Sequence, residues 1–183
     1  MGIAGGRGRD RDGPIAAAAG NLKKVTLELG GKSPCIIMPD ADLERAIPAA
    51  AMAVLFNSGQ TCTATTRLYA HASIYEEVIA GIVDVAKNVK VGPGFAEDSV
   101  LGPLVSAKQL ARVESFVARG RDEGDEIVYG GRQIGDTGYF FEPTVVNARS
   151  EASTLICEEI FGPVITGQPF SDMEEVIGLA NAS

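Results

Sequence analysis

One cysteine of this chain stands among residues that suit a reactive thiol better than a packed one. Cys62 lies in the segment FNSGQTCTA (56–64), between Thr61 and Thr63, and residues 55–66 contain no acid and no base. Gly59 and the small polar neighbours let a reactant approach the sulfur. A thiol is a strong nucleophile, and backbone N–H groups in such a loop can stabilise the oxyanion that forms when it attacks a carbonyl. The segment therefore indicates covalent chemistry at Cys62.

The other two cysteines indicate packing, and the only histidine, His71, is expected to be a surface or half-buried strand residue. Cys35 lies in the apolar stretch CIIM, which is typical of a core cysteine, and Cys157 precedes two glutamates that disfavour a thiolate. His71 follows Cys62 by nine residues, in an expected strand, so a cysteine-protease dyad is disfavoured because its base must contact the thiol. Three cysteines and one histidine predict neither a disulfide framework nor a metal site.

A carboxylate is the remaining partner for Cys62. If a thioester forms at the sulfur, a base must activate the water that releases it. Glu28 is a candidate because it lies near the end of an otherwise apolar strand, just before Gly30 and Gly31. An acid in that position is, by itself, more often a solvent-facing strand residue, so the residues alone leave its role open.

The glycine-rich segments do not match a phosphate-binding loop. GGRGRD and GPGFAED lack the spacing and the strand–helix context of a dinucleotide fingerprint, and no G-x-x-x-x-G-K-[ST] sequence is present. These glycines are predicted to form turns.

Composition excludes several classes of protein. The chain has 183 residues, 45% of them hydrophobic, which fits one folded domain or the larger part of one. Residues 25–183 carry 11 basic and 22 acidic side chains, a net charge of −11, which disfavours nucleic-acid binding. No apolar run is long enough to span a membrane and no secretory signal is evident, so a reducing, cytoplasmic setting is expected.

Strand-like and helix-like segments alternate, which predicts an α/β fold. Residues 1–13, rich in Gly, Arg and Asp, are predicted to be a disordered leader. Pro48 is expected to kink its helix or to begin a new one. The stretch CIIM is expected to be a short buried strand. The expected strands cover residues 24–29, 35–38, 66–71, 126–131, 139–146 and 163–170, and the expected helices cover 15–19, 42–55, 74–89, 107–121 and a segment after 172.

Three motifs taken together resemble the aldehyde dehydrogenase superfamily. They are VTLELGGKSP (25–34), FNSGQTCTA (56–64) and CEEIFGPV (157–164), and the connecting segments LGPLVS and FEPTVV also fit. The likeness covers residues 14–183. It implies an aldehyde-dehydrogenase-like catalytic domain over 31–183, truncated at its C-terminal end. Residues 14–30 would be a remnant of the Rossmann-type cofactor domain, reduced to its last strand.

The resemblance also implies a role for each matching residue. Cys62 would be the nucleophile that forms a thiohemiacetal with an aldehyde, and Glu28 the general base for deacylation. Glu159, Phe161 and the Leu29 backbone would contact the nicotinamide end of NAD or NADP, and Phe56, Thr61 and Thr63 would line the aldehyde pocket.

The implied activity is NAD(P)-dependent oxidation of an aldehyde to a carboxylate, in a family that forms homo-oligomers. Members of the family are more than twice as long, and most of the cofactor domain has no counterpart here. A second hypothesis therefore stands beside the first: a non-catalytic fragment that at most associates with intact subunits.

Overall fold

The computed structural model describes residues 2–6, 12–20 and 24–182, and the chain divides into two compact units. We call residues 1–31 the N-terminal unit and residues 32–183 the main unit. Each unit is described by itself.

The N-terminal unit is a small strand–helix–strand motif. Strand β1 (Gly2–Gly6) pairs in parallel with β2 (Val25–Leu29), and helix α1 (Asp12–Ala19) lies between them in sequence. Of the leader expected over residues 1–13, residues 2–6 form β1 and residues 12 and 13 begin α1, and β2 is accompanied by a second strand. Strand pairing uses backbone N–H and C=O groups, which a glycine-rich segment also supplies. The rest of the expected leader, residues 1 and 7–11, lies outside the described residues.

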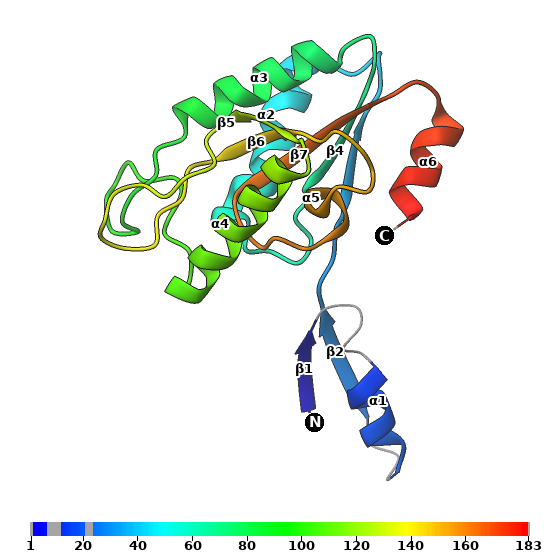
Figure 1. The fold of residues 1–183 in the computed structure, drawn as a ribbon, viewed down its shortest axis with the longest axis vertical. Coiled ribbons are helices and arrows are strands. Elements are labelled where there is room, and N and C mark those ends of the chain that lie inside the picture. Colours follow the sequence, from blue (N-terminus) through cyan, green and yellow to red (C-terminus); the bar gives the residue numbers. More distant parts are fainter. Residues whose placement is uncertain (1, 7–11, 21–23, 183) are drawn as a thin grey trace. The chain divides into compact units, whose positions relative to one another are not determined.

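The main unit is built on a five-stranded sheet in the order β3-β4-β7-β6-β5 (Figure 1). Adjacent strands are parallel except β5, which runs antiparallel to β6. The strands are β3 (Pro34–Ile37), β4 (Arg67–His71), β5 (Glu126–Tyr129), β6 (Thr144–Asn147) and β7 (Val164–Phe170). The α/β class expected from the alternating segments is confirmed.

Helices cover both faces of this sheet. On one face, α2 (Leu43–Leu55) and α3 (Tyr75–Asn88) enclose the larger apolar core. On the other, α4 (Ala107–Asp122) and the short α5 (Thr154–Cys157) cover a second core, and α6 (Met173–Asn181) closes a small third cluster. A 3₁₀ turn, η1 (Phe56–Gly59), follows α2 directly.

The central strands contribute side chains to both layers. In β6, Val145 belongs to the α2–α3 core while Val146 belongs to the α4–α5 core, and in β7 Ile165 and Val164 divide in the same way. This is the period-2 alternation of a strand, here apolar on both sides because helices cover both faces.

Two local expectations can be compared with the structure. Pro48 lies inside the continuous helix α2, so no new helix begins there, and its side chain is exposed. Strand β3 is not fully buried: it is an edge strand, with Ile36 exposed and Cys35 half-buried. An apolar run does not by itself distinguish an edge strand from a central one.

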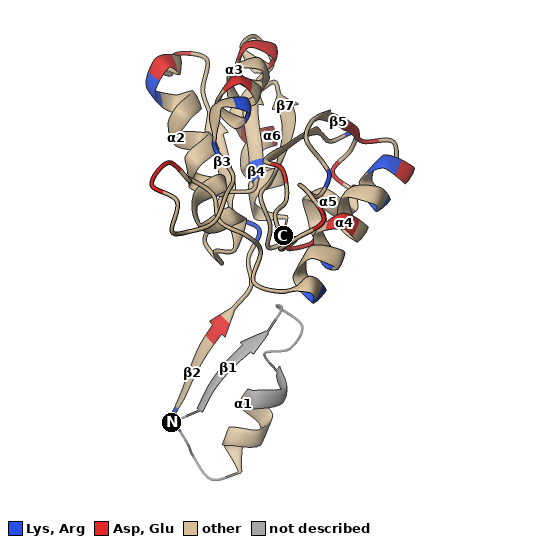
Figure 2. Ribbon diagram, turned by 90° about the vertical axis from the view of Figure 1, so that its left-hand side faces the viewer, with Lys and Arg blue, Asp and Glu red and all other residues tan. Residues whose placement is uncertain are grey.

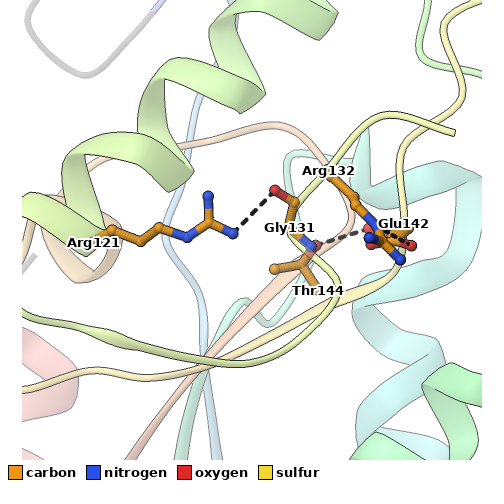
Figure 3. A network of polar contacts seen from close by, with 5 residues as sticks. All are labelled: Arg121, Gly131, Arg132, Glu142 and Thr144. Atoms are coloured by element: carbon orange, nitrogen blue, oxygen red, sulfur yellow. Dashed lines mark hydrogen bonds and ion pairs between the residues drawn. The ribbon is translucent and has the colours of Figure 1, made fainter. Parts of the chain in front are cut away.

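The turn after β5 is fastened to β6 by hydrogen bonds to one glycine (Figure 3). Gly131 has φ +87° and donates its N–H to Oγ1 of the buried Thr144 over 2.9 Å. The Thr144 hydroxyl in turn donates to the Glu142 carbonyl over 2.8 Å, and Arg121 of α4 donates to the Gly131 carbonyl over 3.4 Å. These contacts tie the EPTVV segment to α4.

Charged residues are distributed over the helices, and α4 carries both signs (Figure 2). Within the described part of the chain, no helix combines the length and apolarity needed to cross a membrane.

Candidate active site

The motifs FNSGQTCTA and CEEIFGPV and the last residues of VTLELGGKSP all lie at the same end of the sheet, the end at which the parallel strands begin. Strands β3, β4 and β7 are parallel neighbours, so the segments that precede them share the edge at their amino ends. Lys32 precedes β3, Cys62 precedes β4, and Glu159 and Phe161 precede β7. The fold thus brings Cys62 to the same edge as Glu159, 97 residues further along the chain.

The segment NSGQTC (57–62), called the Cys62 loop, has several residues with left-handed backbone conformation. Asn57, Ser58 and Gly59 all have positive φ, at 51°, 56° and 71°. The Ser58 hydroxyl donates to the Gly102 carbonyl over 2.7 Å, which fixes the turn to a distant segment. Left-handed conformations of non-glycine residues cost about 1–3 kcal/mol each and are concentrated at functional sites. Cys62 follows this turn with its side chain exposed.

A contact between two glycines joins the Cys62 loop to the segment EEIFGP (158–163), called the Glu159 loop. A Cβ built on Gly59 would lie 1.9 Å from the carbonyl oxygen of Gly162 and 2.8 Å from the nitrogen of Pro163. No side chain fits between these backbones. The segments NSGQTC and EEIFGP are therefore packed directly against each other.

The backbone of the Glu159 loop is held from α4. Gln109 donates through Nε2 to the carbonyls of Ile160 and Phe161, over 3.1 and 2.7 Å. Arg112 donates to the carbonyls of Glu159 and Ile160. Phe161 has φ +59°, a further left-handed residue beside Gly162. The loop is therefore fixed by side chains outside the matched motifs.

The three predicted pocket residues lie in the same segment as Cys62. Phe56 begins η1 with 68% of its surface exposed, Thr61 is half-buried and Thr63 is exposed. Their role as an aldehyde pocket stays a prediction.

Glu28 and Leu29 belong to the other unit. Both lie at the end of β2, where the Glu28 side chain is exposed and Leu29 is half-buried. Because Cys62 is in the main unit, the expected pairing of Glu28 with Cys62 stays a prediction.

The three cysteines are free and differ in their surroundings. Burial raises the pKa of the half-buried Cys35. Cys157 is exposed rather than packed, and its thiol donates to the Glu151 carbonyl over 3.1 Å. It lies at the C-terminal end of the one-turn helix α5, where the thiol reaches solvent.

His71 is a half-buried residue at the end of β4, as expected. Its Nδ1 lies 2.8 Å from the Ser73 hydroxyl, and its ring packs edge-on against Phe170. Among the described residues, no group of three or more His, Cys, Asp or Glu side chains could hold a metal ion.

Sequence reasoning overlooked three residues of this edge: Lys32, Gln109 and Arg112. Gln109 and Arg112 are three residues apart and so share one face of α4, a spacing that was available in the sequence. Nothing in the sequence indicated that they would bond to a loop about 50 residues away. The side chain of Lys32 is only 7% exposed, which is uncommon for lysine.

Comparison with known proteins identifies the family. The model of the aldehyde dehydrogenase family matches residues 14–183, so the chain belongs to this family. It is 47% identical over 167 residues to the mitochondrial aldehyde dehydrogenase of Leishmania tarentolae, covering 91% of this chain and 34% of that protein. It is 44% identical over 171 residues to betaine aldehyde dehydrogenase of Bacillus subtilis, covering 91% and 35%. The chain thus spans about a third of the length of these relatives.

Solved structures agree with this assignment. The NAD+ complex of an aldehyde dehydrogenase from Bacillus cereus superposes with a TM-score of 0.94 at 42% identity, covering 99% of this chain and 37% of that one. A mutant of aldehyde dehydrogenase C from Pseudomonas syringae, in complex with NAD+ and octanal, gives 0.92 at 35% identity, covering 98% and 38%.

Proposed function

We propose that this chain carries the cysteine and nicotinamide-contact elements of an NAD(P)-dependent aldehyde dehydrogenase, which oxidises an aldehyde to a carboxylate. The observation that supports this most strongly is the contact between Gly59 and Gly162. It packs the loop of the proposed nucleophile, Cys62, against the loop of the proposed cofactor-contact residues, Glu159 and Phe161.

Cys62 begins the reaction by adding its sulfur to the carbonyl carbon of the aldehyde. The carbonyl oxygen becomes an oxyanion, which the N–H of Cys62 stabilises. NAD or NADP, when bound, supplies the acceptor for the hydride that leaves the thiohemiacetal carbon. Glu28 then takes a proton from water, whose oxygen attacks the thioester carbon. The carbon–sulfur bond breaks, the carboxylate leaves, and the Cys62 thiolate is regenerated.

The residues present fit the nicotinamide end of such a cofactor. A carboxylate at Glu159 can accept hydrogen bonds from ribose hydroxyls, as acidic residues do in other dinucleotide sites. Gln109 and Arg112 donate to backbone carbonyls of the same loop, so the main chain that carries Glu159 is held before binding. Preorganisation of this kind reduces the entropic cost of binding.

The roles of Cys62 and Glu28 can be tested without cofactor. Incubation with 4-nitrophenyl acetate should acetylate Cys62, raising the mass of the intact chain by one acetyl group. Cys62→Ala should abolish this adduct. Glu28→Gln should let the adduct form and then persist, because general-base catalysis contributes about 10²–10⁴-fold to such a step.

Each outcome bears on one role. An acetyl group on Cys157 or Cys35 instead would contradict the nucleophile assignment. An adduct that decays equally fast in Glu28→Gln and in wild type would contradict the assignment of the base. Glu77→Gln, an exposed glutamate of α3, is the matched control and should behave as wild type.

The second candidate is a fragment without turnover that associates with intact subunits of the family. It is favoured by the share of the relatives' length that the chain spans, about a third. Co-purification with a full-length family member, together with no NADH production by the chain alone, would support it. The three free cysteines suit a reducing compartment, and under either candidate we place the chain in the cytoplasm.

A further inference from the structure

The turn that precedes Cys62 has a backbone conformation that its own residues do not favour. Asn57 and Ser58 have positive φ without being glycine, and such a conformation persists only where the surrounding structure holds it. The Asn57 side chain donates to the Gln60 carbonyl over 3.0 Å, and the Gln60 side chain donates to the Asn57 carbonyl over 3.3 Å. These bonds join the turn to itself, so its place in the fold depends on contacts with other segments.

Two side chains of the Cys62 loop bond to one distant segment. The hydroxyl of Ser58, a residue only 3% exposed, donates to the Gly102 carbonyl over 2.7 Å. Oε1 of Gln60 accepts from the Val105 N–H over 2.8 Å. Both partners lie in residues 101–105, which we call the LGPLV segment. One bond uses an acceptor of this segment and the other a donor, so the loop is attached to it at two points.

The LGPLV segment is itself anchored in both apolar cores. Leu101 and Leu104 are each 1% exposed; Leu101 belongs to the α2–α3 core and Leu104 to the α4–α5 core. Their backbone N–H groups donate to the carbonyls of Lys90 and Tyr139, over 3.1 and 2.8 Å. A segment with one side chain in each core has little freedom to move, so it is a fixed support for the Cys62 loop.

The same stretch of chain continues into the residues that hold the Glu159 loop. Ser106 follows the LGPLV segment and caps α4, where its hydroxyl accepts from the Gln109 N–H over 3.2 Å. Gln109 and Arg112 then donate to carbonyls of the Glu159 loop. Residues 101–112 therefore bond to both loops, and this one stretch sets how the two loops lie relative to each other.

We propose that Ser58 and Gln60 are positioning residues: their hydrogen bonds to the LGPLV segment fix the main chain that presents the N–H and the sulfur of Cys62. The inference rests on the proposed function for the purpose of that positioning, whereas the bonds themselves do not depend on it. An oxyanion donor must lie about 2.7–3.1 Å from the oxygen that it stabilises, so the position of the Cys62 N–H decides its effect.

Two reagents separate positioning from the general reactivity of the thiol. With 4-nitrophenyl acetate, the Cys62 sulfur adds to the ester carbonyl, an oxyanion forms, and 4-nitrophenolate leaves as its bond to the carbon breaks. With iodoacetamide, the sulfur displaces iodide from a saturated carbon, and no oxyanion forms. Both reactions need the thiolate, so the ratio of the two rates at one pH reports the oxyanion donor and not the ionisation or the exposure of the thiol.

Four variants of the full chain isolate the two bonds. Ser58→Ala removes the donor to Gly102, and Ser99→Ala is its control, because the Ser99 hydroxyl has no hydrogen-bond partner among the described residues. Gln60→Met removes the acceptor for the Val105 N–H, whereas Gln60→Glu keeps an oxygen at that position. Both Gln60 variants lose the bond to the Asn57 carbonyl, so they differ in the Val105 bond.

The ratio of acetylation to alkylation at Cys62, measured by peptide mass spectrometry, should fall about tenfold or more in Ser58→Ala and Gln60→Met, since a misplacement of about 1 Å can cost about 10²-fold in rate. Ser99→Ala should keep the wild-type ratio, and Gln60→Glu should recover most of it. An unchanged ratio in Ser58→Ala and Gln60→Met, or an equal fall in Gln60→Glu and Gln60→Met, would overturn the inference. If Ser58→Ala does not fold, the two Gln60 variants decide the question.

Amide hydrogen exchange tests the same bonds without any reaction at the sulfur. In Gln60→Met the Val105 N–H should exchange faster, and so should the Ala64 N–H, which donates to the Thr61 carbonyl within the Cys62 segment. The Thr166 N–H, bonded to the Thr66 carbonyl inside the sheet, is the reference and should be unchanged. If wild type is not acetylated at Cys62, the proposed function fails, and exchange decides the positioning: unchanged Ala64 exchange would overturn it.

Discussion

Gly59 and Gly162 are in backbone contact: a Cβ on Gly59 would lie 1.9 Å from the Gly162 carbonyl oxygen. Gly162 is equally enclosed on its other side, since its own Cβ would lie 2.5 Å from a methyl group of Val113 on α4. The Cys62 loop, the Glu159 loop and α4 therefore form one stack in which neither glycine can be enlarged without displacement.

The first prediction concerns this stack. Gly59→Ala should lower the free energy of unfolding by roughly 2 kcal/mol or more, because a positive φ and a backbone clash both oppose a methyl group. Urea denaturation measures the change. Gly94→Ala is the control: no atom lies within 4 Å of its Cβ position, and the change should stay within about 0.5 kcal/mol. Equal stability of both variants would argue against the contact.

A second prediction concerns the order in which the three cysteine thiols are alkylated. Under limiting iodoacetamide, Cys62 should be alkylated first, Cys157 next and Cys35 last. The Cys62 side chain is exposed, the Cys157 thiol must give up its bond to the Glu151 carbonyl, and burial of Cys35 raises its pKa. Peptide mass spectrometry over a time course gives the order. Faster alkylation of Cys157 than of Cys62 would contradict the prediction that Cys62 is the most reactive thiol.

A third prediction concerns the buried hydroxyl of Thr144. Thr144→Val keeps the shape of the side chain but removes the acceptor for the Gly131 N–H and the donor to Glu142 (Figure 3). The free energy of unfolding should fall by about 1–3 kcal/mol, the cost of leaving buried polar groups unpaired. Thr144→Ser retains both bonds and should cost about 0.8 kcal/mol for the lost methyl group. If the free energy of unfolding falls by a similar amount in both variants, the packing of Thr144 contributes more to stability than its hydrogen bonds.

The fourth prediction is a pH dependence of stability caused by Lys32. Burial lowers its pKa in the folded chain to about 7, below the ordinary value of 10.5, so between these two pH values the unfolded chain binds a proton that the folded chain lacks. This contribution makes the chain more stable as the pH rises from about 7 toward 10.5.

Lys32→Met should remove that increase and stabilise the chain at pH 7, by an amount on the order of a few kcal/mol. Unfolding in urea at pH 6.5 and pH 9 compares the two proteins. Lys108 is an exposed lysine of α4, and the control variant Lys108→Met should keep the wild-type change in the free energy of unfolding between the two pH values. If the free energy of unfolding of Lys32→Met changes between pH 6.5 and pH 9 as much as that of the wild type, a group other than Lys32 causes the pH dependence.

The fifth prediction is that the isolated chain shows little NAD-dependent aldehyde oxidation. The residues proposed to contact the cofactor are Glu159, Phe161 and Leu29, which would reach only its nicotinamide end. Holding reactants in place can supply about 7–11 kcal/mol of the barrier, and this requires the whole dinucleotide to be fixed. Absorbance at 340 nm with excess NAD or NADP and several aldehydes measures turnover. Robust production that is lost in Cys62→Ala would overturn this expectation.

The sequence by itself determined the α/β class, most of the elements and the candidate nucleophile. Helical spacing and strand alternation are local, so α3, α4 and β7 could be predicted closely from neighbouring residues. Cys62 was recognisable because its polar, uncharged neighbours are adjacent in the chain. The motifs that indicate the family are likewise contiguous.

Only the tertiary structure decided which segments meet. The order of strands places β7 between β4 and β6, and that order brings the Glu159 loop beside the Cys62 loop. The support from Gln109 and Arg112 and the burial of Lys32 depend on contacts between residues about 35 to 50 positions apart. No local pattern encodes such contacts, because they follow from the packing of helices on a sheet whose strand order is not the order of the sequence.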